Sequence, residues 1–113
     1  NLLDYNIKEK GNGYLIEIYS THTFDEKLIP IWRTDNNWLS ISIPGGLIDS
    51  LKINSKTPKY PIDEINTVQM NDAAQISFLL KAIPDDFEVT SQNKKIVIVF
   101  LLTGILSGIY LIA

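Results

Sequence analysis

The sequence predicts an all-β domain, built as a sandwich or a barrel. Short runs rich in β-branched residues are separated by turn clusters at near-regular intervals along the chain. Helical periodicity, with apolar residues recurring about every three to four positions, is weak throughout. The chain has 113 residues, of which 45% are hydrophobic and 20% charged, and this composition fits one folded domain with a real core.

Three strands are predicted in the first half of the chain, each with alternating apolar residues. They follow a mixed lead-in, residues 1–13, which ends in a Gly-Asn-Gly turn. The predicted strands cover residues 14–20, 27–33 and 38–44. The residues expected to face the core are Ile16, Ile18, Ile29, Ile31, Leu39, Ile41 and Ile43. The third strand is the clearest because apolar and polar residues alternate up to the Pro-Gly-Gly that ends it.

The second half of the chain carries further runs with strand character. A short apolar piece, residues 47–53, leads into the polar connection 54–61, which contains two prolines. The runs after this connection cover residues 62–70, 74–82, 86–91 and 95–102. The sequence therefore predicts strands on both sides of the connection.

The two halves form a weak internal repeat. Each half reads strand, polar bend, strand, polar turn, strand. Ile16 aligns with Ile76, and residues 39–43 align with residues 96–100, given a gap of about three residues in each bend. The alignment predicts that residues 96–100 form a strand.

The uncharged end of the chain, residues 96–113, raises the alternative of a membrane helix. A spanning helix needs about 20 apolar residues, and this run is slightly shorter. Val and Ile crowd its beginning, and Thr, Ser and Gly residues interrupt it from Thr103 onward. We therefore favour a strand followed by a hydrophobic C-terminal strand at 103–113. The alternative is that 103–113 begins a membrane or partner segment.

Charge and composition argue against several function classes. The formal net charge is −3, and clustered Lys and Arg, which phosphate neutralisation requires, are absent from the sequence, so nucleic acid is not an expected partner. The chain has no cysteine, so it contains neither a disulfide framework nor a thiolate metal site.

Titratable side chains form no recognisable catalytic set. The single histidine, His22, lies near Asp25 and Glu26, a pattern too common to predict a metal site. The pairs Asp85-Asp86 and Asp63-Glu64 are poor acid–base pairs because adjacent residues of a strand point to opposite faces. We expect no enzyme activity, no metal site and no cofactor.

Trp32 and Trp38 are the strongest candidates for a binding surface. If the isoleucines of their strands face the core, both tryptophans face outward, provided that an odd-length hairpin loop joins the strands. Two registers satisfy this condition, and one of them pairs the tryptophans directly, as a cross-strand pair that only stabilises the sheet. The other hypothesis is an aromatic binding platform flanked by Arg33, because Trp and Arg are typical of binding hot spots.

The order of these segments resembles the AMIN domain over about residues 13–102. The resemblance rests on "GYLIEIYSTHTF", "IPIWRTDNNWLSISIPGG", "IDSLKI" and "AQISFLLKAIPDDFEVTSQNKKIVIVF". AMIN domains precede catalytic or pore domains in bacterial envelope proteins such as N-acetylmuramoyl-L-alanine amidases and type IV pilus secretins. The resemblance implies a β-sandwich of two related antiparallel sheets at residues 14–102.

The same resemblance implies a non-catalytic function in the bacterial cell envelope. The domain would bind peptidoglycan, or an envelope protein, and so localise an attached domain in the periplasm. The ligand would then lie on Trp32, Arg33 and Trp38. The alternative is a protein-interaction or membrane-anchored subunit of a secretion or motility assembly, with membrane contact through the C-terminal segment. An exposed terminal strand would also permit copies of the chain to pair by their edges.

Overall fold

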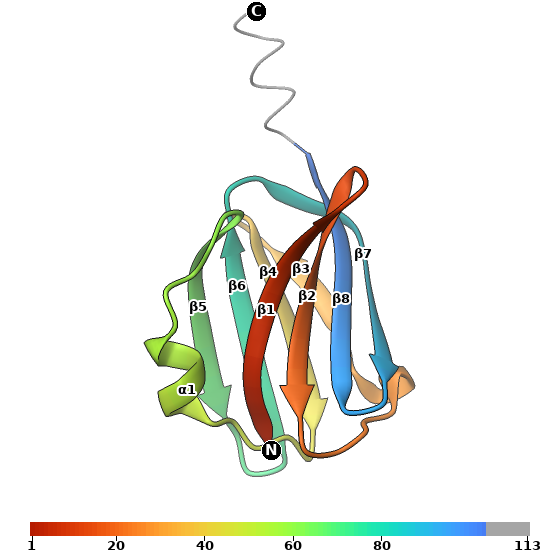
Figure 1. The fold of residues 1–113 in the computed structure, drawn as a ribbon, viewed down its shortest axis with the longest axis vertical. Coiled ribbons are helices and arrows are strands. Elements are labelled where there is room, and N and C mark those ends of the chain that lie inside the picture. The colour runs from red at the N-terminus through yellow and green to blue at the C-terminus, as the bar shows by residue number, and fades with distance from the viewer. Residues whose placement is uncertain (104–113) are drawn as a thin grey trace, which may run out of the picture.

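The computed structural model describes residues 1–103, which form a sandwich of two four-stranded antiparallel sheets (Figure 1). Sheet A has the strand order β1-β2-β8-β7, and sheet B has the order β3-β4-β6-β5. The strands are β1 (Leu2–Lys10), β2 (Gly13–Ser20), β3 (Ile31–Thr34), β4 (Trp38–Pro44), β5 (Ile62–Gln69), β6 (Ala73–Leu80), β7 (Ile83–Gln92) and β8 (Lys95–Thr103). A 3-10 turn η1 (Glu26–Leu28) and a short helix α1 (Ser50–Ser55) lie between them. The all-β prediction is confirmed.

The core lies between the two sheets and is built from the central strands. In sheet A, Ile16 of β2 pairs with Ile98 of β8, and in sheet B, Ile41 of β4 pairs with Ile76 of β6. These four side chains are at most 1% exposed. Burying an isoleucine of this kind stabilises the fold by roughly 1.5–3 kcal/mol. Of the predicted core residues, Ile31 alone is partly exposed, while the others are buried.

The strand order repeats the weak sequence repeat in three dimensions. Exchanging β1, β2, β3 and β4 with β5, β6, β7 and β8, respectively, converts the order of sheet A into β5-β6-β4-β3, which is sheet B counted from its other edge. The aligned residues Ile16 and Ile76 lie in β2 and β6, and each pairs with the middle residue of an aligned run. A bulge also interrupts β1 and β5 near their starts. Each half therefore contributes two strands to each sheet.

The segment expected as a lead-in contains strand β1, which forms one edge of sheet A. Tyr5 faces the core and is 3% exposed, and Ile7 packs beside it. The end of β1, Lys8–Lys10, is exposed, so the alternation of buried and exposed residues covers only the first part of the strand. This short alternation explains why the sequence pattern did not separate β1 from a loop.

Two further segments contain helical turns that the sequence did not predict, and only the first of them, residues 27–33, was predicted as a strand. Within residues 27–33, η1 precedes the strand, and β3 begins only at Ile31, after Pro30. Within residues 47–53, the chain enters α1, where the Asp49 carboxylate caps the helix by accepting a hydrogen bond from the Lys52 N–H (3.3 Å). Neither element is long enough to produce a periodic pattern in the sequence.

Strand β8 confirms the strand predicted at residues 96–100. It lies inside sheet A, hydrogen-bonded to β2 on one side and to β7 on the other. Thr103 ends β8, and the remainder of the predicted segment 103–113 lies outside the described residues. Among residues 1–103, no helix has the length and apolar character needed to span a bilayer.

Candidate binding face

The β3–β4 hairpin places both tryptophans on the outer face of sheet B. Its register pairs Trp32 with Ser40 and Thr34 with Trp38, and the loop 35–37 between the strands has the predicted odd length. The tryptophans are therefore diagonal neighbours on one face and not a directly opposed pair. Both side chains are half-buried. The hairpin thus presents two indoles on the side of sheet B that faces away from the core.

Small polar side chains continue this outer face across the sheet. Alternate positions of β4, β6 and β5 share the face with the tryptophans because strand residues point to opposite sides in turn. The polar residues at these positions are Ser40, Ser42, Gln75, Ser77 and Asn66. Within residues 1–103, Glu64 is the one charged residue that the cross-strand pairings place among them. We call the surface formed by Trp32, Trp38 and the polar residues Ser40, Ser42, Gln75, Ser77 and Asn66 the tryptophan face, and Glu64 lies at its edge.

A hydroxyl pair lies at the centre of the tryptophan face. The Oγ atoms of Ser40 and Ser77 are 2.7 Å apart and share a hydrogen bond across β4 and β6. The two serines are only 4% and 7% exposed although they point away from the core. Large neighbours explain this, since Trp32 lies directly opposite Ser40 and Trp38 lies two residues along the same strand. The serine pair is therefore a shielded link between β4 and β6, and the accessible polar groups of the face come from Ser42, Gln75 and Asn66.

Arg33 does not join the tryptophans. It follows Trp32 in β3, so its side chain leaves the strand on the opposite side. There its Nη1 donates a hydrogen bond to the Pro84 carbonyl oxygen of β7 (3.4 Å). The structure thus brings together Trp32 and Trp38, whereas Arg33 bonds to the other sheet.

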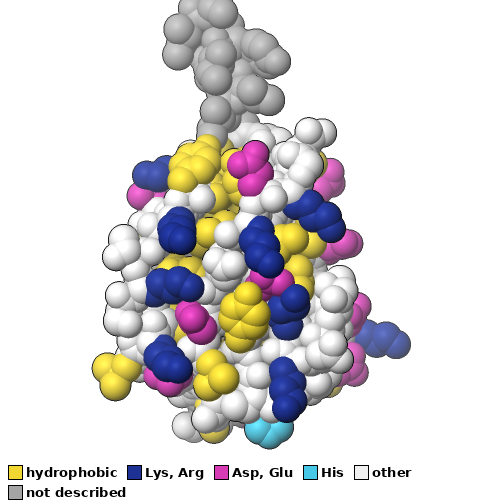
Figure 2. All heavy atoms as spheres, in the orientation of Figure 1, with side chains coloured by type: hydrophobic (Ala, Val, Ile, Leu, Met, Phe, Trp, Pro, Cys, Tyr) yellow, Lys and Arg dark blue, Asp and Glu magenta, His cyan; other side chains and the backbone are white. Residues whose placement is uncertain are grey.

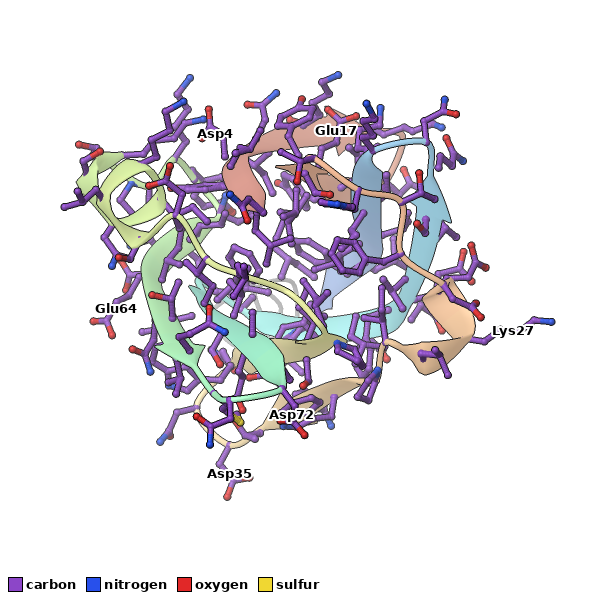
Figure 3. All side chains as sticks on the ribbon, turned by 90° about the horizontal axis from the view of Figure 1, so that it is seen from below. Asp4, Glu17, Lys27, Asp35, Glu64 and Asp72 are labelled. Atoms are coloured by element: carbon purple, nitrogen blue, oxygen red, sulfur yellow. The ribbon has the colours of Figure 1, made fainter. Side chains whose placement is uncertain are left out.

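The outer face of sheet A is built differently, around a shielded carboxylate. The Glu17 side chain is 6% exposed, and its Oε1 lies 2.9 Å from Lys8 Nζ while its Oε2 lies 2.6 Å from Lys95 Nζ. The Tyr19 hydroxyl donates a third hydrogen bond to Oε1 (3.1 Å). Figure 3 shows Glu17 on the outer side of sheet A, and Figure 2 shows Lys or Arg side chains spread over this face. Acidic and basic groups are interleaved here.

The two lysines keep Glu17 ionised. Hydrogen bonds from Lys95 and then from Lys8 lower the pKa of the Glu17 carboxyl from 4.5 to about 2, against the opposing effect of burial. A carboxyl with this pKa holds no proton near neutral pH and cannot act there as a general acid. The Glu17 cluster is therefore an ion-pair network on the surface of the sheet.

His22, Asp25 and Glu26 form local hydrogen bonds. The Asp25 carboxylate accepts a hydrogen bond from the Lys27 N–H (3.0 Å), and the Glu26 carboxylate accepts one from the Ser91 N–H (2.9 Å). His22 is exposed and shares a hydrogen bond with the Thr21 hydroxyl (2.7 Å). Among residues 1–103, no three His, Asp or Glu side chains gather as metal ligands would.

Comparisons with known proteins assign this chain to no family. No family model, curated protein or solved structure matches this chain.

Proposed function

We propose that this chain is a non-catalytic binding module that holds a glycan on the tryptophan face of sheet B. The observation that supports the proposal is the placement of Trp32 and Trp38 on the same outer face as the accessible polar side chains of Ser42, Gln75 and Asn66. Indole rings stack on the apolar faces of sugar rings, and hydroxyl and amide groups exchange hydrogen bonds with sugar hydroxyls. A polysaccharide is a ligand that uses both kinds of group.

The low charge of the tryptophan face favours a sugar over a strongly charged ligand. Glu64 lies at the edge of the face on β5, two strands away from Trp38 on β4. An anionic polymer would require clustered cations, and a face with one carboxylate offers none. The buried serine pair also joins β4, which carries Trp38, to β6, and so helps to hold this surface in one arrangement for a rigid ligand.

The specific glycan that we propose is peptidoglycan, on the basis of the AMIN resemblance. In that role the module would localise an attached domain in the periplasm and would perform no chemistry itself. A β-sandwich of two related sheets agrees with this proposal because the resemblance implies the same architecture. The tryptophan face would supply the contact with the cell wall.

Co-sedimentation with purified, insoluble peptidoglycan tests the proposal. Trp32→Ala and Trp38→Ala should each weaken binding by about tenfold or more, which corresponds to roughly 1.4 kcal/mol. Trp32→Phe should retain part of the affinity because it keeps a flat ring. Circular dichroism of each variant establishes that the sheets are intact.

The matched control is Tyr60→Ala, which removes an aromatic ring that is 58% exposed and lies outside the tryptophan face. It should bind peptidoglycan as the unmodified chain does. Unchanged binding of the folded Trp32→Ala and Trp38→Ala variants would contradict the proposal. So would an equal loss of binding in Tyr60→Ala.

A further inference from the structure

The tryptophan face ends at a groove of about 390 Å³, which lies along the β5 edge of sheet B. One wall of the groove is β5 at residues 63–67, and the other is the segment 53–58, which leaves α1 and runs beside β5 (Figure 1). Asn66 and Glu64 line the groove and also lie on the outer side of sheet B. The groove is therefore a continuation of the tryptophan face. Its volume falls within the range of roughly 300–1,000 Å³ that is usual for small-molecule sites.

Unpaired main-chain groups of β5 face this groove. The Met70 N–H bonds to the Ala73 carbonyl oxygen at the hairpin end, so alternate residues from Val68 backward direct their main-chain groups toward β6. Ile65 and Thr67 therefore direct their N–H and carbonyl groups toward the groove. Within residues 1–103, no hydrogen bond from a loop or side chain reaches these main-chain groups. The groove thus offers both donors and acceptors to a ligand.

Most of the charged side chains in the groove are paired within the domain. Asp63 Oδ1 lies 2.7 Å from Lys81 Nζ, and Lys56 Nζ lies 3.3 Å from Asp4 Oδ1. Within residues 1–103, Glu64 is the one charged groove residue without an ion pair, and Figure 3 shows it directed away from the body of the domain. The remaining polar groups are amides, a hydroxyl and main-chain groups. This set suits a neutral ligand that is rich in hydroxyl and amide groups.

The segment 53–58 limits what the groove can hold. The Asn54 side-chain amide donates a hydrogen bond to the Thr67 hydroxyl (3.5 Å) and so crosses the groove at that end. A further β-strand would need an uninterrupted edge, which this crossing does not leave. A sugar ring needs only a few hydrogen-bond partners close together. The acetamido group of an N-acetylated sugar carries one N–H and one carbonyl group, which match the free main-chain groups of β5.

A row of side chains across sheet B joins the tryptophans to the groove. Trp38 of β4 lies opposite Leu79 of β6, and Leu79 lies opposite Glu64 of β5. Leu79 is half-buried on the outer side of the sheet, because its neighbours Phe78 and Leu80 face the core. An indole followed by an aliphatic side chain continues the apolar contact that the faces of sugar rings require. Neighbouring strands are about 4.8 Å apart, so the path from β3 to β5 is roughly 14 Å long.

We propose that the groove beside β5 is a second subsite for the glycan, which holds a neutral N-acetylated sugar ring of the same chain whose other rings stack on Trp32 and Trp38. This inference rests on the proposed function, and it adds the direction and the length of the ligand. The glycan runs across the strands of sheet B. Successive rings of a 1,4-linked glycan repeat at nearly the spacing of neighbouring strands, so about four rings are needed to reach from β3 into the groove.

Titration of the nitrogen-15-labelled full chain with the dimer, tetramer and hexamer of N-acetylglucosamine tests the subsite. The indole N–H signals of Trp32 and Trp38 should shift with every oligomer. The side-chain amide signal of Asn54, on the far wall of the groove, should shift only with the tetramer and the hexamer. The dissociation constant should fall by about tenfold or more from the dimer to the tetramer and change little from the tetramer to the hexamer.

Two single changes in the groove should separate the oligomers by length. Glu64→Ala and Asn54→Ala should each weaken tetramer binding by about three- to tenfold and leave dimer binding unchanged, because only the longer oligomer reaches the groove. The matched controls are Glu88→Ala, at an exposed glutamate of β7 in sheet A, and Asn71→Ala, at an exposed asparagine between β5 and β6. Neither control should change the binding of any oligomer.

Failure of the groove subsite differs from failure of the glycan face. Equal affinity for the dimer and the tetramer overturns the subsite alone, as does unchanged tetramer binding in both groove variants. A chain that sediments with peptidoglycan but binds no oligomer also overturns the subsite alone. If neither peptidoglycan nor any oligomer binds, and the signals of Trp32 and Trp38 do not move, the proposed function fails and the subsite fails with it.

Discussion

The two sheets have equivalent strand arrangements, but their outer faces carry different side chains, charged on sheet A and aromatic or uncharged polar on sheet B. By the internal repeat, Glu17 of sheet A corresponds to Ser77 of sheet B, and Lys95 corresponds to Trp38. Sheet A therefore surrounds a carboxylate with ammonium groups, whereas sheet B covers a hydroxyl pair with indoles. The difference shows that the backbone sets where the outward positions lie, while the side chains that the two halves place there together determine which ligands each face could bind.

The largest loss of stability is expected at core positions that are equivalent in the two sheets. Ile16→Ala and Ile76→Ala each remove an equivalent buried side chain, and each should lower the free energy of unfolding by about 2–5 kcal/mol. The two losses should agree within about 1 kcal/mol if the sheets pack equally well against each other. Urea unfolding with the m-value monitored measures both. Very unequal losses would show that the repeat does not extend to packing.

A smaller effect is expected where sheet A differs from sheet B. Glu17→Gln leaves Lys8 and Lys95 without their shared counter-charge and should lower the free energy of unfolding at pH 7 by roughly 1–3 kcal/mol. The loss is below that of a fully buried pair because solvent reaches both lysines. Thermal or urea unfolding provides the value.

The pH dependence of that loss identifies its cause. The pKa of Glu17 is lowered on folding, so the unfolded chain binds its proton first as pH falls. The stabilisation is complete above about pH 4.5 and disappears as pH falls toward about 2. The difference in stability between the unmodified chain and Glu17→Gln should shrink over this window. A difference that does not change with pH would mean that packing, and not charge, is responsible.

The smallest effect is expected at the hydroxyl pair of sheet B. Ser40→Ala or Ser77→Ala alone leaves one shielded hydroxyl without its partner and should cost about 1–2 kcal/mol of unfolding free energy. The double variant should cost less than the sum of the single changes, since both polar groups are gone. A double-mutant cycle in urea measures this coupling. Strictly additive losses would show that the hydrogen bond contributes nothing.

The sequence predicted the interior strands β4 and β8, the first because its alternation of apolar and polar residues is uninterrupted and the second through the internal repeat. β4 was predicted with its observed bounds, residues 38–44, and its apolar residues Leu39, Ile41 and Ile43 are all buried. β8 was predicted through the repeat, although its apolar run also suggested a membrane helix. Both strands lie inside their sheets, hydrogen-bonded to a neighbour on each side.

Edges and neighbours were harder to predict. β1 and β3 lie at the ends of their sheets, where partial exposure blurs the alternation of residue types. The candidate site was predicted only as far as the hairpin that contains Trp32 and Trp38. Its serine partner Ser77 comes from β6, and no local pattern tells which strand lies beside β4. The same limit applies to Glu17, whose lysine Lys95 is nearly at the other end of the chain.

The interleaving of the two halves makes folding an all-or-none event for the chain. Each sheet needs a hairpin from before the connection 54–61 and a hairpin from after it. A fragment cut at this connection would hold two hairpins with exposed apolar faces and no partner, so neither fragment should fold alone. Mixed together, the fragments should reassemble by complementation. Contacts between such distant segments also predict slow folding for a domain of this size.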